Sequence, residues 1–257
     1  MKFDMHCHTN EGSMDGKVPI EEYISKLESL GFGGMLTADH NTYNGYREWK
    51  NTIKGQRHSE FVVLKGIEYD TIDAGHILII MPYNTKLRIL ELRGLPVGIL
   101  IEVVHHFGGV LGPAHPCGER YLSITNTKKK RSKTEWITKF DFIEAFNACE
   151  SPESNEAAQQ IARKYHKPGF GGSDAHKIEC VGKAYTEFPD TVKTETDLIA
   201  YLHTNPTLSY GGSRYNHTTK NKLGKLNAIL VQGFFLYNKA GGLLRSHRRH
   251  LELKKII

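Results

Sequence analysis

The sequence predicts an α/β fold with a mostly parallel sheet or barrel. Short apolar runs alternate with segments of helical periodicity over about the first two hundred residues, and this alternation is typical of βαβ units. The chain has 257 residues, of which 39% are apolar and 24% charged. That length fits one large domain or two small ones, and the composition excludes collagen-like, disordered and disulfide-scaffold proteins.

The predicted strands are short apolar runs bounded by polar residues or glycine. They cover residues 2–6, 34–38, 61–67, 76–81, 110–114, 142–146 and 169–172. The predicted helices carry apolar side chains three or four residues apart, as Tyr23, Leu27 and Leu30 do in the first of them. They cover residues 20–30, 99–107, 154–164 and 196–203.

Residues 217–257 predict a helical extension that follows a barrel formed by residues 1–216. One helix face is apolar and comprises Leu226, Ile229, Leu230, Phe234 and Tyr237. We expect the glycine pair at 241–242 to end this helix, and residues 243–257 to form a second, basic one. The two helices are expected to pack on the barrel with their basic residues in solvent. The alternative is a surface that attracts anionic substrates, nucleic acid or a partner subunit.

The net charge of +6 belongs to this extension. It holds nine basic residues and one acid, so 34 minus 9 leaves 25 basic residues against 27 acidic ones before position 217. A basic protein would indicate an acidic partner such as nucleic acid. Because the rest of the chain is slightly acidic, the net charge is weak evidence about the substrate.

The chain is predicted to work in the cytoplasm. Its four cysteines are widely spaced without a C-x-x-C pair, which favours reduced thiols over a disulfide framework. Polar residues follow the first methionine at once, unlike a signal peptide. The longest uncharged apolar stretch, residues 226–238, is too short to span a bilayer.

Histidines and carboxylates gather around the ends of the predicted strands. His6 and His8 close the first strand, and side chains at i and i+2 of an extended chain point the same way. The others are Asp39, His40, Glu68, His76, His115, Asp174 and His176. Ligand and catalytic groups of α/β folds collect at the carboxyl ends of strands. Imidazole and carboxylate without thiolate favour a multinuclear site for Zn²⁺, Mn²⁺ or Fe²⁺.

Five motifs resemble, in order and spacing, those of the polymerase-and-histidinol-phosphatase (PHP) family. They are Asp4-x-His6-x-His8-Thr9, Asp39-His40-Asn41, Gly66-x-Glu68, Ala114-His115-Pro116 and Ser173-Asp174-Ala175-His176. The resemblance implies a distorted (β/α)7 barrel with a di- or trinuclear metal centre at its open end. The C-terminal helical extension lies outside the resemblance.

The resemblance also implies a set of ligands for each ion. The first ion would have His6, His8, Glu68 and Asp174; the second Asp15, His40 and His176; the third Glu68, His76 and His115, with Glu68 bridging. Asp39 is expected to orient a histidine instead of binding metal. The chain departs from the family pattern at Ala38 and Met14, where threonine and serine are usual, and both positions lie close to predicted ligands of the second ion.

Such a centre implies hydrolysis of a phosphate ester by a metal-bridging hydroxide held by Glu68 and Asp174. Arg120 and Arg214 are candidates for binding the phosphate, with an ordinary surface arginine as the alternative for each. The expected activity is that of a metal-dependent phosphoesterase, a phosphatase or phosphodiesterase. The expected partner is a small phosphorylated metabolite or nucleotide. Nucleic acid is not indicated, and the oligomeric state stays open.

Two other functions remain as alternatives. Barrels with histidine-rich strand ends also hydrolyse C–N bonds; three metal ions with a basic pocket would favour phosphate, and a single ion or a pair without basic groups would favour amides. The chain could also be a non-catalytic metal-binding module or a polymerase accessory. The complete set of ligands argues against that reading.

Overall fold

The structure is a computed structural model that describes residues 1–53, 57–118, 122–126, 135–215 and 227–256. Its strands are β1 (Lys2–Cys7), β2 (Gly34–Thr37), β3 (Val62–Asp70), β4 (His76–Ile80), β5 (Val110–Pro113), β6 (Ile143–Asn147), β7 (Gly169–Gly172), β8 (Ala184–Glu187) and β9 (Tyr210–Gly212). Its α-helices are α1 (Ile20–Ser29), α2 (Asn44–Glu48), α3 (Val97–His106), α5 (Pro152–Lys164), α6 (Glu195–Leu202), α8 (Asn227–Leu244) and α9 (Ser246–Ile256). Short π- or 3₁₀-turns are η1 (Trp49–Ile53), η2 (Arg88–Glu91), η3 (Ile124–Asn126) and η4 (Ile178–Cys180).

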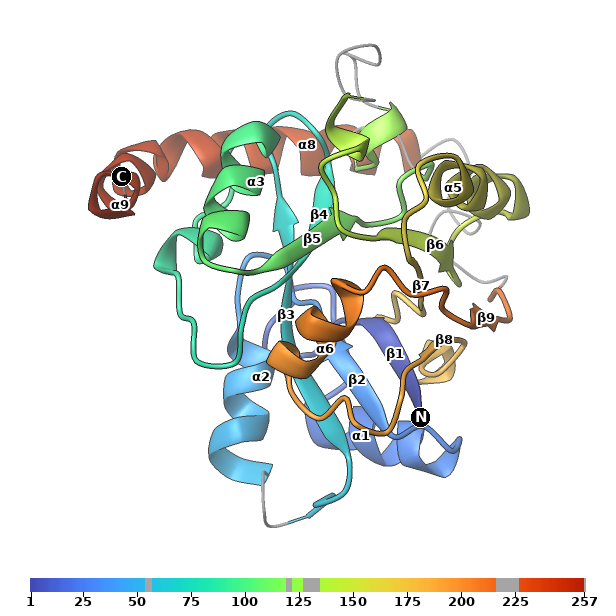
Figure 1. Ribbon diagram of the computed structural model, residues 1–257. Coiled ribbons are helices and arrows are strands. Elements are labelled where there is room, and N and C mark those ends of the chain that lie inside the picture. Colours follow the sequence, from blue (N-terminus) through green and yellow to red (C-terminus); the bar gives the residue numbers. More distant parts are fainter. Residues whose placement is uncertain (54–56, 119–121, 127–134, 216–226, 257) are drawn as a thin grey trace.

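The strands curl into a barrel, which confirms the predicted α/β fold class (Figure 1). One sheet has the order β5-β4-β3-β2-β1-β8-β9, and a second sheet pairs β6 with β7. The second sheet meets the first at the edge strand β5 and again at β1, which lies between β2 and β8. The amide of Asp141 donates to the carbonyl of Leu111 between β5 and β6. Between β7 and β1, Asp174 donates its amide to His6 at 2.9 Å, and Cys7 bridges Ala175.

The sheet is less parallel than predicted. β1, β2 and β3 pair in parallel, as do β6 and β7, but β4 pairs antiparallel with both β3 and β5. Residues 71–75 join β3 to β4 as a short hairpin, and a parallel connection would need a crossover of a dozen or more residues. β8 and β9, which were not predicted, add antiparallel beside β1.

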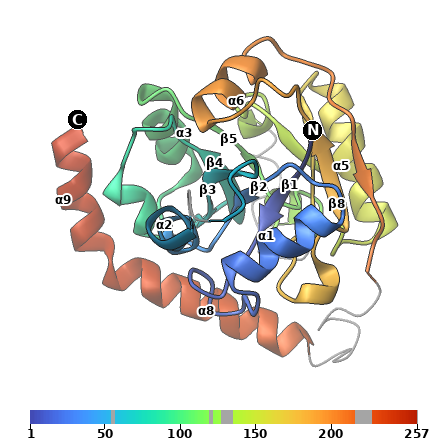
Figure 2. The ribbon, with the colours of Figure 1, turned by 90° about the horizontal axis from the view of Figure 1, so that it is seen from below.

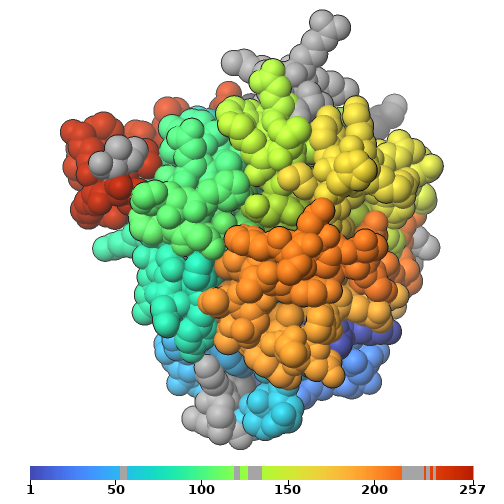
Figure 3. Space-filling view, viewed as in Figure 1, coloured from blue at the N-terminus to red at the C-terminus, as the bar shows by residue number. Residues whose placement is uncertain are grey.

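The apolar core leaves the carboxyl ends of the strands to polar residues. Phe3, Leu64 and Phe170, from the beginnings or middles of their strands, pack with Leu198 and Leu202 of α6. α6 and its flanking segments lie across the front of the barrel, as the orange surface in Figure 3 shows. Apolar side chains fill the end of the barrel that α6 covers. The histidines and carboxylates lie together near the opposite ends of the strands.

Helix α8 runs through the glycine pair that was expected to end it, so this prediction is wrong. The glycines lie where α8 passes the segment after η2 at close range. A Cβ at Gly94, which has φ +99°, would lie 3.1 Å from the Cα of Gly242. A Cβ at Gly241 would lie 3.2 Å from Arg93 Cδ. Close approach of two chain segments accounts for these glycines better than helix termination does.

The predicted apolar face of the extension is only partly described. Leu226 lies outside the described residues, Ile229 is 67% exposed, and Tyr237 is half-exposed. The following helix α9 contributes Leu253 and Ile256 to the apolar cluster around η2, and Figure 2 shows both helices bordering one side of the barrel. None of the helices in the described ranges is both long and apolar enough to cross a membrane.

Candidate metal centre

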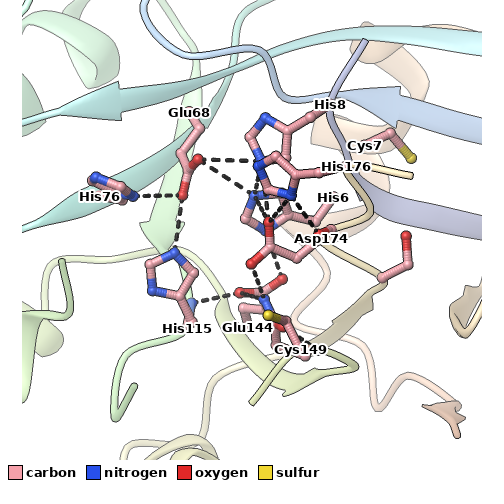
Figure 4. Close-up of polar contacts among 12 residues, drawn as sticks. His6, Cys7, His8, Glu68, His76, His115, Glu144, Cys149, Asp174 and His176 are labelled. Carbon is pink, nitrogen blue, oxygen red and sulfur yellow. Dashed lines mark hydrogen bonds and ion pairs between the residues drawn. The ribbon is translucent and has the colours of Figure 1, made fainter. Parts of the chain in front are cut away.

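The structure brings all nine predicted ligands together, and Figure 4 labels all of them except Asp15 and His40. They come from β1, β3 and β4 and from the turns that follow β1, β2, β5 and β7. Most are buried, with His6 and His8 at 0% exposure and Glu68 at 1%. Cys7 points away from them into an apolar cluster, because successive side chains of a strand face opposite sides of the sheet.

Four side chains meet at the end of β1. His6 Nε2 and His8 Nε2 are 3.0 Å apart, and each lies within 3.6 Å of Asp174 Oδ1. Glu68 Oε2 lies 3.5 Å from the first nitrogen and 3.4 Å from the second. These are the residues that the resemblance assigned to the first ion. We call this group the first cluster.

Hydrogen bonds show which ring nitrogens of the first cluster carry protons. His6 Nδ1 lies 2.8 Å from Glu144 Oε1 and donates to this carboxylate. His8 Nδ1 lies 3.1 Å from Ser13 Oγ, whose own proton goes to Asp39 Oδ1. In neutral rings the two Nε2 atoms therefore face each other with lone pairs. A cation between them removes this repulsion, so the donor set fits a metal ion.

Glu68 joins the first cluster to two further histidines. Its Oε1 lies 3.0 Å from His76 Nδ1 and 3.1 Å from His115 Nε2, and these three residues form what we call the third cluster. Its Oε2 faces the first cluster. The two oxygens thus point at different groups, which is the arrangement of a bridging carboxylate.

The second cluster consists of Asp15, His40 and His176. Asp15 Oδ2 lies 3.2 Å from His176 Nε2 and 3.8 Å from His40 Nε2, and His8 lies within ligand distance of both histidines. The Asp15 side chain is 51% exposed and that of His176 28% exposed, whereas the first and third clusters are buried. Solvent therefore reaches the centre from the side of the second cluster.

Asp15→Asn is expected to lower the amount of bound metal by one ion per chain and to leave the buried clusters loaded. Asp15 is the most exposed ligand, and Asn keeps its size while removing the charge. Elemental analysis after dialysis against Mn²⁺ measures this. Equal metal content in Asp15→Asn and the unchanged protein would remove Asp15 from the ligand set.

Asp39 acts on the histidines through a second residue. It accepts hydrogen bonds from the amide and hydroxyl of Thr9, the hydroxyl of Ser13 and the amide of Gly45. Ser13 Oγ in turn accepts from His8 Nδ1. The expectation that Asp39 orients a histidine thus corresponds to a contact through Ser13.

Two buried carboxylates of the centre were not predicted. Glu144 bonds His6 Nδ1 and the amide of His115, yet it lay inside a predicted strand. A lone acid in an apolar strand was the available signal. Asp70 lies beyond the predicted strand 61–67, but β3 continues to Asp70. Its spacing of two residues from Glu68 places both carboxylates on one face of the strand.

The backbone is strained at the centre. His115, Asp174 and Asn41 have φ values of 28°, 52° and 54°, in the left-handed region that most side chains avoid. Each follows a strand that carries ligands to the centre. Such conformations persist where the surrounding structure fixes them, and they cluster at functional sites.

In the metal-free protein, the surroundings shift the pKa values of His40 and His8 in opposite directions. Burial lowers the pKa of His40, but neighbouring carboxylates, chiefly Glu68 and Asp70, outweigh it and raise the pKa to about 10. In contrast, burial and the nearby His176 and His40 lower the pKa of His8 to about 4.

Metal binding at pH 8 is expected to release a proton from His40. This pH lies below its pKa of about 10, so the metal-free ring is protonated, and a metal ligand must be neutral. The release should decline as the pH rises through 10. Calorimetry in buffers with different heats of ionisation measures it. Binding heats that do not depend on the buffer would contradict the expectation.

The two arginines proposed for phosphate are not both described. Arg120 lies outside the described residues. Arg214 is half-buried, and its Nε donates to the carbonyl of Glu150. Its neighbour Tyr215 donates a hydrogen bond to the carbonyl of Asp174 at 2.9 Å. Arg214 is therefore next in sequence to a residue that contacts Asp174 of the first cluster. Its own hydrogen bond goes to a backbone carbonyl.

The fold and the three clusters define an α/β barrel whose histidine and carboxylate clusters suit divalent metal ions. The chain belongs to the PHP domain family, whose model matches residues 4–168, and the PHP-associated model matches residues 152–207. No curated protein matches the chain at the level of sequence.

Solved structures share the fold at low sequence identity. A protein from Bifidobacterium adolescentis described as a metal-dependent phosphoesterase superposes with a TM-score of 0.56 at 17% identity, over 68% of this chain and 88% of that one. Endonuclease Q in complex with a duplex that contains an abasic lesion gives 0.59 at 16%, over 88% and 66%. An amidohydrolase from Chromobacterium violaceum gives 0.57 at 13%, over 78% and 96%.

Proposed function

We propose that the chain is a metal-dependent phosphoesterase that hydrolyses a small phosphorylated metabolite or nucleotide. The observation that carries this proposal is the set of three adjoining clusters that share Glu68. Three divalent ions supply more positive charge than amide hydrolysis needs, and a phosphoryl group needs that charge to be neutralised. The family of the chain supports the same class of reaction.

Bound divalent ions would supply a water with a pKa near 7 and would neutralise phosphoryl charge. The residues of the chain hold this arrangement rigid. Glu144 and Ser13 fix the rings of His6 and His8, so that both Nε2 atoms converge. Glu68 Oε2 and Asp174 Oδ1 flank that point, and we propose that these two carboxylates hold the attacking water.

Substrate would approach from the side of Asp15 and His176, which are the exposed members of the centre. We propose Arg120 and Arg214 as donors to the non-reacting phosphate oxygens, because a guanidinium binds phosphate with two parallel hydrogen bonds. The four cysteines are free thiols, which supports a reducing compartment such as the cytoplasm.

A panel of substrates tests the proposal. It contains p-nitrophenyl phosphate, bis(p-nitrophenyl) phosphate, an abasic DNA duplex and an amino-acid p-nitroanilide, each with added Mn²⁺, Zn²⁺ or Fe²⁺. We expect metal-dependent cleavage of a phosphate ester, lost in His8→Ala. His105→Ala is the matched control, since His105 is an exposed histidine bonded to Asp141. Cleavage of the anilide alone would favour a C–N hydrolase, and an inert metal-loaded protein would overturn the proposal.

A further inference from the structure

We propose that Asp70 is a positioning residue that fixes His40 and His76 together, and that helix α8 holds Asp70 in place through Arg93. The inference rests on the proposed metal centre but not on the identity of its substrate. It assigns the C-terminal helices a part in metal retention.

Asp70 lies between one histidine of the second cluster and one of the third. Its Oδ1 is 3.4 Å from His40 Nδ1 and 3.3 Å from His76 Nε2. Asp70 and His76 are direct partners across the antiparallel pair of β3 and β4, so their side chains leave the sheet together. The Asp70 carboxylate is 3% exposed. Its Oδ1 faces the rings of both His40 and His76, whose centroids are 5.1 Å apart.

The contacts with Asp70 use one nitrogen of each ring, so the other nitrogen of His40 and of His76 is left to bind metal. His76 presents Nε2 to Asp70 and Nδ1 to Glu68. His40 presents Nδ1 to both Asp70 and Glu68, and Nε2 to Asp15. A carboxylate on the far nitrogen of a ligating histidine fixes its ring orientation and tautomer and raises its basicity. Asp70 would do this for two ligands at once.

The second oxygen of Asp70 is held from two sides. Asn41 Nδ2 donates to Oδ2 at 2.7 Å, and Asn41 Oδ1 accepts the amide of Asp70 at 3.0 Å. Arg93 Nη2 lies 3.6 Å from the same Oδ2, and the Arg93 side chain is 10% exposed. A buried guanidinium beside a buried carboxylate keeps the carboxylate charged and restricts its rotation.

The C-terminal helices hold Arg93. Asn238 of α8 accepts a hydrogen bond from Arg93 Nη1, and the Tyr237 ring lies 4.9 Å from the guanidinium carbon. Arg249 of α9, itself buried, donates to the backbone carbonyls of Arg93 and Gly242. A continuous series of contacts therefore joins α8 to Arg93, Arg93 to Asp70, and Asp70 to two histidines of the centre.

Asp70→Asn tests the first half of the proposal. We expect Mn²⁺ affinity, measured by calorimetry on the metal-free protein, to fall about 10- to 100-fold while the number of ions bound at saturation stays the same. Asp73→Asn is the matched control, because Asp73 lies in the same hairpin and caps the first turn of α3 instead. The unfolding temperature of the metal-free protein shows whether the fold is intact. Unchanged affinity would overturn the proposal, and so would the loss of one ion at saturation, which would make Asp70 a ligand.

Asn238→Ala tests the second half without touching the metal centre. We expect Mn²⁺ affinity to fall about three- to tenfold, because the lost hydrogen bond acts on the centre only indirectly, through Arg93 and Asp70. Gln232→Ala, at an exposed position of the same helix, should have no effect. In the Asp70→Asn background, Asn238→Ala should lose its effect. Additive effects would mean that α8 does not act through Asp70.

The reference measurement separates this inference from the proposed function. If the unchanged protein binds no Mn²⁺, the metal centre itself is wrong. If it binds Mn²⁺ and both variants bind equally well, only the part played by Asp70 and α8 is wrong.

Discussion

Glu68→Gln is expected to lower phosphate-ester hydrolysis at least about a thousandfold. Glu68 is buried and faces the first cluster with one oxygen and the third with the other, so an amide cannot hold both ions. Losing several kcal/mol of charge stabilisation in the transition state corresponds to a loss of this size. Initial rates at saturating Mn²⁺, together with elemental analysis, measure the loss of activity and of metal.

Glu187→Gln serves as the control, because Glu187 is an exposed glutamate on β8. It should keep full activity and full metal content. A Glu68→Gln protein with near-normal rates would show that Glu68 does not bridge the clusters. Normal metal content with low activity would show that Glu68 takes part in the reaction but is not needed to bind the metal ions.

Removal of the metal ions is expected to lower the unfolding temperature by about 10 °C. An ion present at about a thousand times its dissociation constant contributes roughly 4 kcal/mol, and 1 kcal/mol moves the midpoint of a chain this long by about 2–4 °C. Without metal ions, only protons on the histidines offset the buried charges of Glu68 and Asp174 in the first cluster. Differential scanning calorimetry before and after treatment with a chelator measures the shift.

Returning Mn²⁺ should restore the original midpoint, and Mg²⁺ should restore less of it, because imidazole-rich sites favour transition metals. If the chelator-treated protein unfolds at the same temperature before and after Mn²⁺ is returned, the clusters do not bind ions in the folded state.

The residues that gather in the three clusters could be predicted because their signals are local. His6 and His8 lie two residues apart at the end of a predicted strand. Glu68, His115 and Asp174 also follow predicted strands. Residue type and distance along the chain are sufficient for this inference. The predicted strands that carry them are present in the structure, with ends that differ by a few residues.

Other features depend on contacts between distant segments. β9 has three residues, and its pairing with β8 across more than twenty residues defines it. The contact of Glu144 with His6 joins residues 138 positions apart. Gly241 and Gly242 resemble a helix terminator in sequence, and only the approach of Gly94 shows their role. Local patterns do not contain this information.

The central claim is that a shared, multinuclear metal centre hydrolyses a phosphate ester. Its most direct test is a titration of the metal-free protein with Mn²⁺ in which the rate of bis(p-nitrophenyl) phosphate or p-nitrophenyl phosphate cleavage is recorded against ions bound per chain. The account predicts no cleavage without metal and a steep rise once the clusters that share Glu68 are loaded. Absence of cleavage of either ester at every loading, or an equal rate in Glu68→Gln, would contradict it.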